Sequence, residues 1–359
     1  MMSGVARGWR GRGAARGVDA GGRGSRGACG AGIFVLNTAS GGHAVVGYHL
    51  SRQLALEGHA VTLMVPGNKG SEKMQKEPFC RWGELRDLGV ATVWGEPADC
   101  AAVTGGEQFD VVVDNNGKDL ETCQPVIDWA ASQAGAGQYL YVSSAGIYLP
   151  SDTPPLVEGD PVDRNASHVA VEEYLAAAPL AESIFRPQYI IGPGNNKDCE
   201  EWFFDRIARG RPVPIPGDGL STTNVAQAED LAKMIALAVG NEAAKGELFN
   251  CVADRGITLD GMVRLCAEAA GRDPEDVRIV HYKPEAIGVN GKKAFPFRYT
   301  YHFFSEPRAA VAKLGMTYTR SLGDALKERW AAYIESGRAE QDLSATFVLD
   351  DEIFASLHN

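Results

Sequence analysis

The stretch IFVLNTASGGHAVVG, residues 33–47, joins a short apolar run to a glycine-rich turn and the start of an amphipathic helix. Val46, Leu50 and Leu54 recur at four-residue spacing, which places them on one face of that helix. A glycine-rich turn between a strand and a helix allows backbone N–H groups to approach a pyrophosphate at the helix N-terminus. The stretch therefore predicts the opening βα unit of a dinucleotide-binding fold.

Further short runs rich in β-branched residues alternate with amphipathic stretches along the first half of the sequence. This alternation predicts an α/β fold with a Rossmann-like, doubly wound parallel sheet. The expected strands are 33–36, 60–65, 90–94, 111–114, 139–143 and 183–186.

The second half differs, because prolines punctuate its loops and helical patterns recur at 202–208, 228–239 and 259–270. We predict a nucleotide-binding domain over residues 31–190 and a smaller α/β lobe over 191–359, interleaved with late elements of the sheet. The segment after Gln341 is expected to form a short strand and a last helical turn.

The charge of the 359-residue protein is unevenly distributed. Residues 1–30 carry a balance of +5, so the remainder is near −16 within a net charge of −11. Phosphate contacts need concentrated lysine and arginine, so nucleic-acid binding would have to use a local patch. Seven scattered cysteines without a C-x-x-C pair favour reduced thiols and argue against a zinc site. The sequence contains no run of eighteen apolar residues, so it predicts no membrane-spanning helix.

Residues 1–30 lack hydrophobic periodicity and hold too little apolar surface to fold. An arginine-rich segment almost free of acids is typical of an organelle transit peptide, although serine is scarce here. The alternative is an arginine–glycine tail that contacts RNA. We expect the transit peptide.

The turn reads Gly41-x-x-Ala44-x-x-Gly47, with Gly42 inside it, and matches the G-x-x-G-x-x-G pattern of short-chain dehydrogenases with an alanine in the middle. The Ala44 methyl group is expected where the backbone should meet phosphate, whereas Gly47 still allows close helix–sheet packing. The second strand ends at Pro66 without the acid that binds the ribose hydroxyls, a loss of roughly 1.5–3 kcal/mol. We expect weakened NAD(P) binding; the alternative is a turn that now only packs.

The strand YLYVSSAGIY, residues 139–148, resembles that of the extended short-chain dehydrogenases and epimerases, in which a serine precedes a Tyr-x-x-x-Lys helix. Ser143 or Ser144 matches the serine, but the tyrosine position holds His168 and the lysine position Glu172. In that family the lysine lowers the tyrosine pKa; a glutamate would instead raise the pKa of a neighbouring histidine. Loss of a positioned acid–base group typically costs about 10²–10⁴ in rate. We therefore expect no dehydrogenase or epimerase chemistry.

His168 and Glu172 are four residues apart and share a helix face. One interpretation is an acid–base pair for phosphodiester cleavage, with Ser143 at the same site. The other is a solvated helix pair.

Seven segments together, 37–47, 143–148, 168–174, 185–206, 212–219, 248–260 and 281–304, resemble the chloroplast stem-loop-binding proteins of the a-type. The resemblance covers nearly everything from about residue 33. It implies an atypical short-chain dehydrogenase fold in the chloroplast stroma, which binds messenger stem-loops and ribosomal RNA and associates with ribosomes. It also implies a role in transcript stability, assembly as an oligomer or with a paralogue, and an endoribonuclease activity that needs a divalent metal, usually Mg²⁺.

No independent nuclease motif is visible, and the sequence leaves the metal ligands unknown. Four acids near one helix start could hold Mg²⁺, namely Asp198, Glu200, Glu201 and Asp205. The simpler interpretation is a solvated first turn, where acids are favoured.

Two stretches combine cations with aromatic residues, as sites for unpaired RNA do. The candidate RNA contacts in them are Arg206, Arg209, Arg211, Lys292, Lys293 and Arg298. The alternative is that the aromatic residues form a core and the cations its rim. Arg186 stands at a strand end before a proline, and we expect it to be structural.

Three functions remain open at this point. The first is a plastid RNA-binding protein with endoribonuclease activity. The second is a ribosome-associated RNA-binding scaffold without catalysis. The third is a residual NAD(P)-dependent oxidoreductase or epimerase, against which the His168/Glu172 positions argue.

Overall fold

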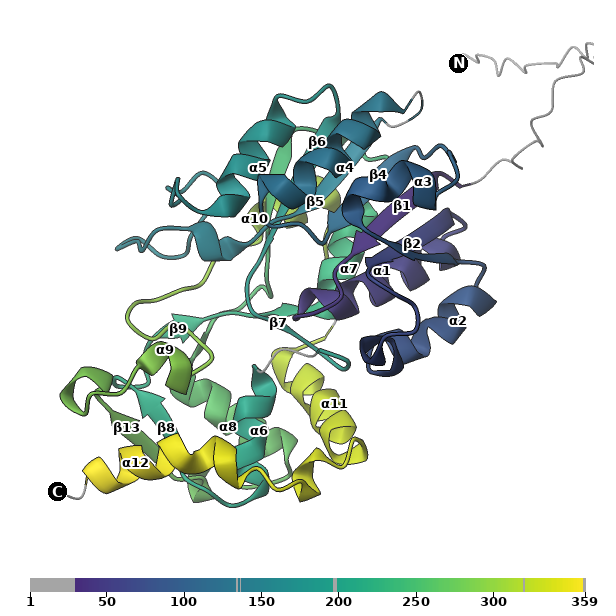
Figure 1. Cartoon of the computed structure of the whole chain (residues 1–359). Coiled ribbons are helices and arrows are strands. Elements are labelled where there is room, and N and C mark those ends of the chain that lie inside the picture. The colour runs from purple at the N-terminus through teal and green to yellow at the C-terminus, as the bar shows by residue number, and fades with distance from the viewer. Residues whose placement is uncertain (1–29, 134, 136, 196–198, 319, 358–359) are drawn as a thin grey trace, which may run out of the picture.

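A seven-stranded parallel sheet forms one of two lobes in the computed structural model, which describes residues 30–133, 135, 137–195, 199–318 and 320–357 (Figure 1). The strand order is β11-β6-β5-β4-β1-β2-β3, so the polypeptide starts in the middle, winds outward, and returns beside β1 to wind the other way. This topology confirms the doubly wound, Rossmann-like fold. The strands are β1 (Gly32–Asn37), β2 (Ala60–Pro66), β3 (Ala91–Gly95), β4 (Val111–Asn115), β5 (Gln138–Val142), β6 (Ala181–Pro187) and β11 (Glu247–Cys251).

Helices cover both faces of this sheet. Side chains alternate along a strand, so that Ile33 and Val35 pack in one core and Phe34 and Leu36 in the other. The first core is closed by α1 (His43–Leu56), α2 (Trp82–Asp87), α7 (Ala228–Ala238) and α10 (Arg308–Leu314). The second is closed by α3 (Cys100–Val103), α4 (Leu120–Ser132) and α5 (Ser167–Ala176).

The other lobe packs helices around a separate, aromatic-rich core. Its elements are α6 (Glu200–Ala208), β8 (Val213–Pro216), α8 (Leu259–Ala269), β13 (Ile279–Tyr282), α9 (Gly291–Ala294), α11 (Leu322–Glu335) and α12 (Val348–Ser356). The strand expected after Gln341 is wrong, because this segment forms a short 3₁₀ turn and then α12.

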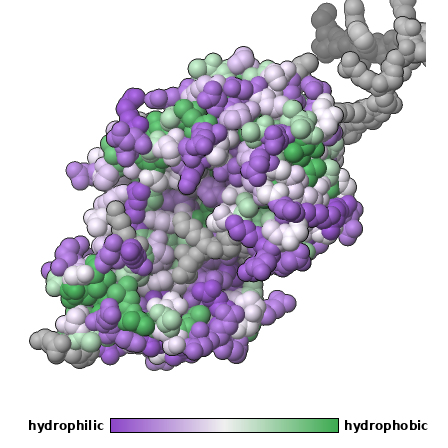
Figure 2. Space-filling model, viewed as in Figure 1, coloured by the Kyte–Doolittle hydropathy of each residue, from purple (hydrophilic) through white to green (hydrophobic). Residues whose placement is uncertain are grey.

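Short strand pairs lie where the polypeptide passes between the lobes. They are β7 (Ile190–Ile191) with β10 (Ala226–Gln227), and β9 (Thr222–Thr223) with β12 (Ile257–Thr258). The space-filling view shows the surface hollowed between the lobes (Figure 2). Crossings of this kind bring residues distant in sequence to one cleft.

The cysteines and the helices also bear on the expectations about thiols and membranes. The six described cysteines are free, and Cys29 lies with the expected transit peptide outside the described residues. Over the part of the protein that the structure describes, no helix is both long and apolar enough to cross a membrane.

Candidate functional site

The position of the short-chain dehydrogenase lysine is occupied by a buried ion pair. Glu172, on α5, accepts hydrogen bonds from Arg186 on β6, with Oε2–Nη2 and Oε1–Nε distances of 2.5 and 3.0 Å. Ser143 Oγ donates to the same carboxylate at 2.6 Å. Arg186 also stacks over the Tyr148 ring, 4.8 Å from its centroid. Both carboxylate oxygens of Glu172 are therefore occupied by buried hydrogen bonds. Arg186 has a structural role, as expected from the sequence.

His168 does not join this pair. Its Nδ1 lies 2.8 Å from the Tyr141 hydroxyl, and burial lowers its pKa although Glu172 acts in the opposite direction. Glu172 raises the His168 pKa, as expected from the sequence, but desolvation outweighs the carboxylate, so the net shift of the pKa is downward. The interpretation of a solvated helix pair is wrong, since Glu172 is 8% exposed.

A series of hydrogen-bonded amides holds the turn at the carboxyl ends of β1 and β4. Asn37 Nδ2 donates to the Ala44 carbonyl at 2.9 Å, and Asn115 Nδ2 donates to Asn37 Oδ1 at 2.6 Å and the His43 carbonyl at 2.8 Å. The side-chain nitrogens of Asn37 and Asn115 both donate to oxygen atoms, which fixes the orientation of each amide. Asn115 Oδ1 is therefore the atom that faces His43 Nδ1, at 3.2 Å, and it acts as the acceptor. This arrangement places the proton of neutral His43 on Nδ1 and makes Nε2 its basic nitrogen.

The glycines of the turn have separate roles. Gly41 has φ +75°, a left-handed conformation that suits glycine, and Gly42 lies close to Ile190 and Asn195 after β6. A Cβ on Gly47 would lie 2.2 Å from Asn37 Cγ, so Gly47 makes room for the amide series. Ala44 packs in the hydrophobic core, so its methyl group does not face the turn, contrary to expectation.

These residues fit only part of a dinucleotide. The turn and the start of α1 can accept phosphate through backbone N–H groups. The end of β2 at Pro66 carries no acid to bind one ribose. The position of the lysine that would hold the other ribose is occupied by Glu172, which is paired with Arg186. The site therefore fits the phosphates of NAD(P) and lacks the contacts that hold its riboses.

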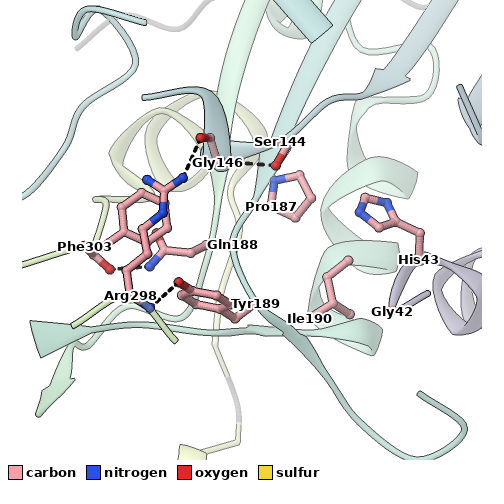
Figure 3. Close-up of a pocket in the computed structure, with 10 residues that line it drawn as sticks. All are labelled: Gly42, His43, Ser144, Gly146, Pro187, Gln188, Tyr189, Ile190, Arg298 and Phe303. Atoms are coloured by element: carbon pink, nitrogen blue, oxygen red, sulfur yellow. Dashed lines mark hydrogen bonds between the residues drawn. The ribbon is translucent and has the colours of Figure 1, made fainter. Parts of the chain in front are cut away.

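A cavity of about 170 Å³ lies beside the turn, between the two lobes (Figure 3). One wall comes from the turn and α1, a second from the loop after β5, a third from the end of β6, and the last from the other lobe. The lining residues are Gly42, His43, Ser144, Gly146, Pro187, Gln188, Tyr189, Ile190, Arg298 and Phe303. Catalytic candidates Ser143, His168 and Glu172 are not among them.

The positive charge of Arg298 lies in this cavity and is not paired with a carboxylate. Its Nη2 donates to the Gly146 carbonyl at 2.8 Å and its Nη1 to the Tyr301 hydroxyl, while the guanidinium lies 4.3 Å from the Phe303 ring centroid. Among the described residues, no carboxylate oxygen lies within 4.0 Å of its nitrogens. The cavity therefore contains a fixed, unneutralised cation with an aromatic neighbour.

The other candidate RNA contacts differ from Arg298. Arg206 is 2% exposed and pairs with Asp350 at 2.8 Å, so it cannot reach a surface ligand and the expectation for it is wrong. Arg209 donates to the Tyr333 hydroxyl and three backbone carbonyls, and Arg211 pairs with Asp351 on α12. Lys293 is exposed, and Lys292 lies in α9 with its side chain outside what the structure describes.

The acidic cluster is neutralised by arginines. Glu200 Oε1 lies 2.8 Å from Arg329 Nε, and Arg338 Nη2 lies 2.7 Å from Asp205. Glu201 pairs with both arginines. Asp198 lies outside the described residues. The three described acids are therefore neither a solvated helix start nor suited to Mg²⁺, and no metal-ligand cluster occurs elsewhere in the described segments.

Sequence reasoning missed two residues of the cavity. Tyr189 has φ +27°, rare for a residue with a side chain, and its hydroxyl accepts a hydrogen bond from the Arg298 backbone at 2.8 Å. His43 follows the glycines directly, and that place at the start of the first helix was the available signal.

Comparisons with known proteins agree with this fold. The family model described as NAD dependent epimerase/dehydratase family matches residues 39–251. UDP-glucose-4-epimerase from Stenotrophomonas maltophila, solved with bound NAD and formylated UDP-arabinopyranose, has a TM-score of 0.67 at 15% identity, covering 86% of this chain and 99% of that one. Pal from Bacillus thuringiensis has a TM-score of 0.65 at 16% identity, covering 84% and 99%. At these identities the structures support the fold alone.

A curated relative gives the narrower relationship. The Arabidopsis thaliana protein described as chloroplast stem-loop binding protein of 41 kDa b, chloroplastic, is 35% identical over 323 residues, which are 88% of this chain and 83% of that protein. The resemblance seen in the sequence is thus confirmed at the level of the family, through a relative of the b-type. The chain belongs to the NAD dependent epimerase/dehydratase family and, within it, to the chloroplast stem-loop binding proteins.

Proposed function

We propose that this protein binds stem-loop RNA in the chloroplast through the cavity that contains Arg298, and that it has no epimerase or dehydrogenase turnover. The name of the Arabidopsis relative supports both the ligand and the compartment. The loss of redox chemistry follows from Glu172, whose ion pair with Arg186 replaces the family's lysine.

The observation that carries the proposal is the unneutralised charge of Arg298. Arg206, Arg211 and Arg329 each pair with a carboxylate, whereas Arg298 is held by a carbonyl, a hydroxyl and an aromatic face. Such a guanidinium keeps its attraction for phosphate and is already positioned to meet it. The protein is acidic overall, so its net charge does not attract RNA, and a local cation such as Arg298 provides the phosphate contact instead.

The test is a binding titration of the protein with a labelled plastid stem-loop RNA at several salt concentrations. We expect Arg298→Ala to weaken binding and to lower the slope of log K against log salt by about 0.7–0.9, the loss of one phosphate contact. Arg298→Lys should retain the slope. The matched control is Arg211→Ala, whose charge is already paired with Asp351 and should matter little. Equal loss in both variants, or loss in Arg211→Ala alone, would contradict the proposal.

We further propose that the protein cleaves the RNA that it binds, and the position of His43 supports this. Its Nδ1 faces Asn115 Oδ1, so Nε2 is the basic nitrogen of a histidine on the cavity wall opposite Arg298. A base can take the proton from the 2′-hydroxyl of RNA. The 2′-oxygen then bonds to phosphorus, the bond between phosphorus and the 5′-oxygen breaks, and the 5′-oxygen takes a proton from water and leaves as a hydroxyl. No step is assigned to Mg²⁺, because the described acids do not fit it.

Product analysis tests this part separately. We expect cleaved RNA to end in a 2′,3′-cyclic phosphate and a 5′-hydroxyl, and His43→Gln to bind RNA without cutting it. Cleavage that yields 5′-phosphate ends, or that persists in His43→Gln, would remove His43 from the chemistry. Binding without cleavage in the unmodified protein would leave a scaffold.

The family resemblance extends the proposal to the biological setting. It includes ribosomal RNA, ribosomes, transcript stability and assembly with a second copy or a paralogue in the stroma. Co-sedimentation of the protein with plastid ribosomes, before and after RNase treatment, checks whether RNA carries that association. If the protein sediments separately from the ribosomes, its RNA-binding function does not involve the ribosome.

A further inference from the structure

We propose that the cavity takes one unpaired nucleotide from the loop of the bound RNA, with its base between the lobes and its phosphate at Arg298. The inference rests on the proposed RNA-binding function and specifies what the site recognises. On this proposal, the cavity is the part of the protein that distinguishes a stem-loop from a plain duplex.

The size of the cavity limits what can enter. Ligand pockets for whole cofactors or drug-sized molecules are typically about 300–1,000 Å³, and this cavity is about 170 Å³. It therefore has room for one base or one ribose, and a dinucleotide would exceed it. A base-paired stem, whose bases are stacked and closed by their partners, cannot insert there, whereas an unpaired loop base can be turned out.

The lining is mixed in the way that a nucleotide requires. Pro187, Ile190 and Phe303 offer apolar surface for a base. Ser144 and His43 offer polar atoms on the walls, and Figure 3 shows Arg298 on the side opposite His43. A base can therefore lie against the apolar walls while its phosphate meets Arg298.

Arg298 is held in place across the two lobes. Its guanidinium donates to the Gly146 carbonyl of the sheet lobe, and its backbone N–H donates to the Tyr189 hydroxyl. Tyr189 has φ +27°, and residues in sparsely populated backbone conformations cluster at functional sites. The Tyr189 hydroxyl thus fixes the backbone of Arg298 where its side chain lines the cavity.

The first arm of the experiment compares a labelled stem-loop with a blunt duplex made from the same stem. We expect the protein to bind the stem-loop at least about tenfold more tightly, the scale of one stacked base. Ser144→Trp, which fills the cavity without removing the charge of Arg298, should reduce stem-loop affinity to that of the duplex and leave duplex affinity unchanged. Ser167→Trp, on the exposed start of α5, is the matched control.

The second arm needs no variant, in case Ser144→Trp fails to fold. A nucleoside 5′-monophosphate should displace the stem-loop from the unmodified protein and should not displace the duplex, and inorganic phosphate at equal ionic strength should displace neither selectively. Equal affinity for both RNAs, or no selective displacement by the nucleotide, would overturn this inference and leave RNA binding intact. Absence of binding to either RNA at low salt would overturn the proposed function as well.

Discussion

Replacing Glu172 with glutamine should destabilise the protein by about 3–5 kcal/mol, the cost of leaving one partner of a buried ion pair charged. The pair is short, at 2.5 and 3.0 Å, and its side chains are 10% and 5% exposed. Arg186 cannot shed its proton, and one of its nitrogens, Nη1, already lacks a hydrogen-bond partner. With a urea dependence of about 2–3 kcal/mol per molar, the unfolding midpoint should fall by roughly 1–2 M.

Urea unfolding followed by circular dichroism checks this, with a control on the same helix. Glu173 pairs with Arg164 at the surface, where the side chains are 63% and 84% exposed, so Glu173→Gln should cost less than about 1 kcal/mol. The double variant Glu172→Leu/Arg186→Met should recover most of the lost stability, because it removes both buried charges. A cost for Glu172→Gln no larger than that for Glu173→Gln would refute the structural role of the pair.

Three further outcomes are expected. Burial lowers the pKa of His49 from 6.5 to about 4, so the unfolded protein binds a proton that the folded one does not; stability should fall as pH drops from about 6.5 towards 4, and His49→Gln should flatten that limb in urea unfolding at stepped pH. Gly47→Ala should lower the thermal midpoint, because its methyl group would lie 2.2 Å from Asn37 Cγ; an unchanged midpoint would show that the amide series is not needed. Chelation with EDTA should leave stem-loop affinity unchanged, because Glu200 and its neighbours are bound by arginines; an EDTA-sensitive affinity would point to metal ligands elsewhere.

The sheet was accessible from the sequence because parallel strands are buried on both faces. Such strands form continuous apolar runs, as in residues 33–36 and 111–113, and these runs need no knowledge of their neighbours to be found. All six expected strands occur within two residues of their predicted ends. The late strand β11 was not located, because its residues ELFNC lack such a run.

The site was less accessible, because its partners are set by contacts between distant elements. Helical spacing paired Glu172 with His168, whereas its partner in the fold is Arg186 on the next strand. Arg206 was interpreted as a surface cation, whereas it pairs with Asp350 on α12, in a segment expected to form a short strand and a last helical turn. Burial of a charge by an element over a hundred residues away leaves no local pattern.

The most direct test of RNA binding at the cavity is to map where the loop of a bound RNA lies. A stem-loop carrying 4-thiouridine at each loop position in turn would be photocrosslinked to the protein and the attached peptides identified by mass spectrometry. We predict crosslinks from one loop position to the cavity segments 187–190 or 298–303, and their loss in Arg298→Ala. Crosslinks concentrated at 206–211, or unchanged in Arg298→Ala, would contradict this prediction.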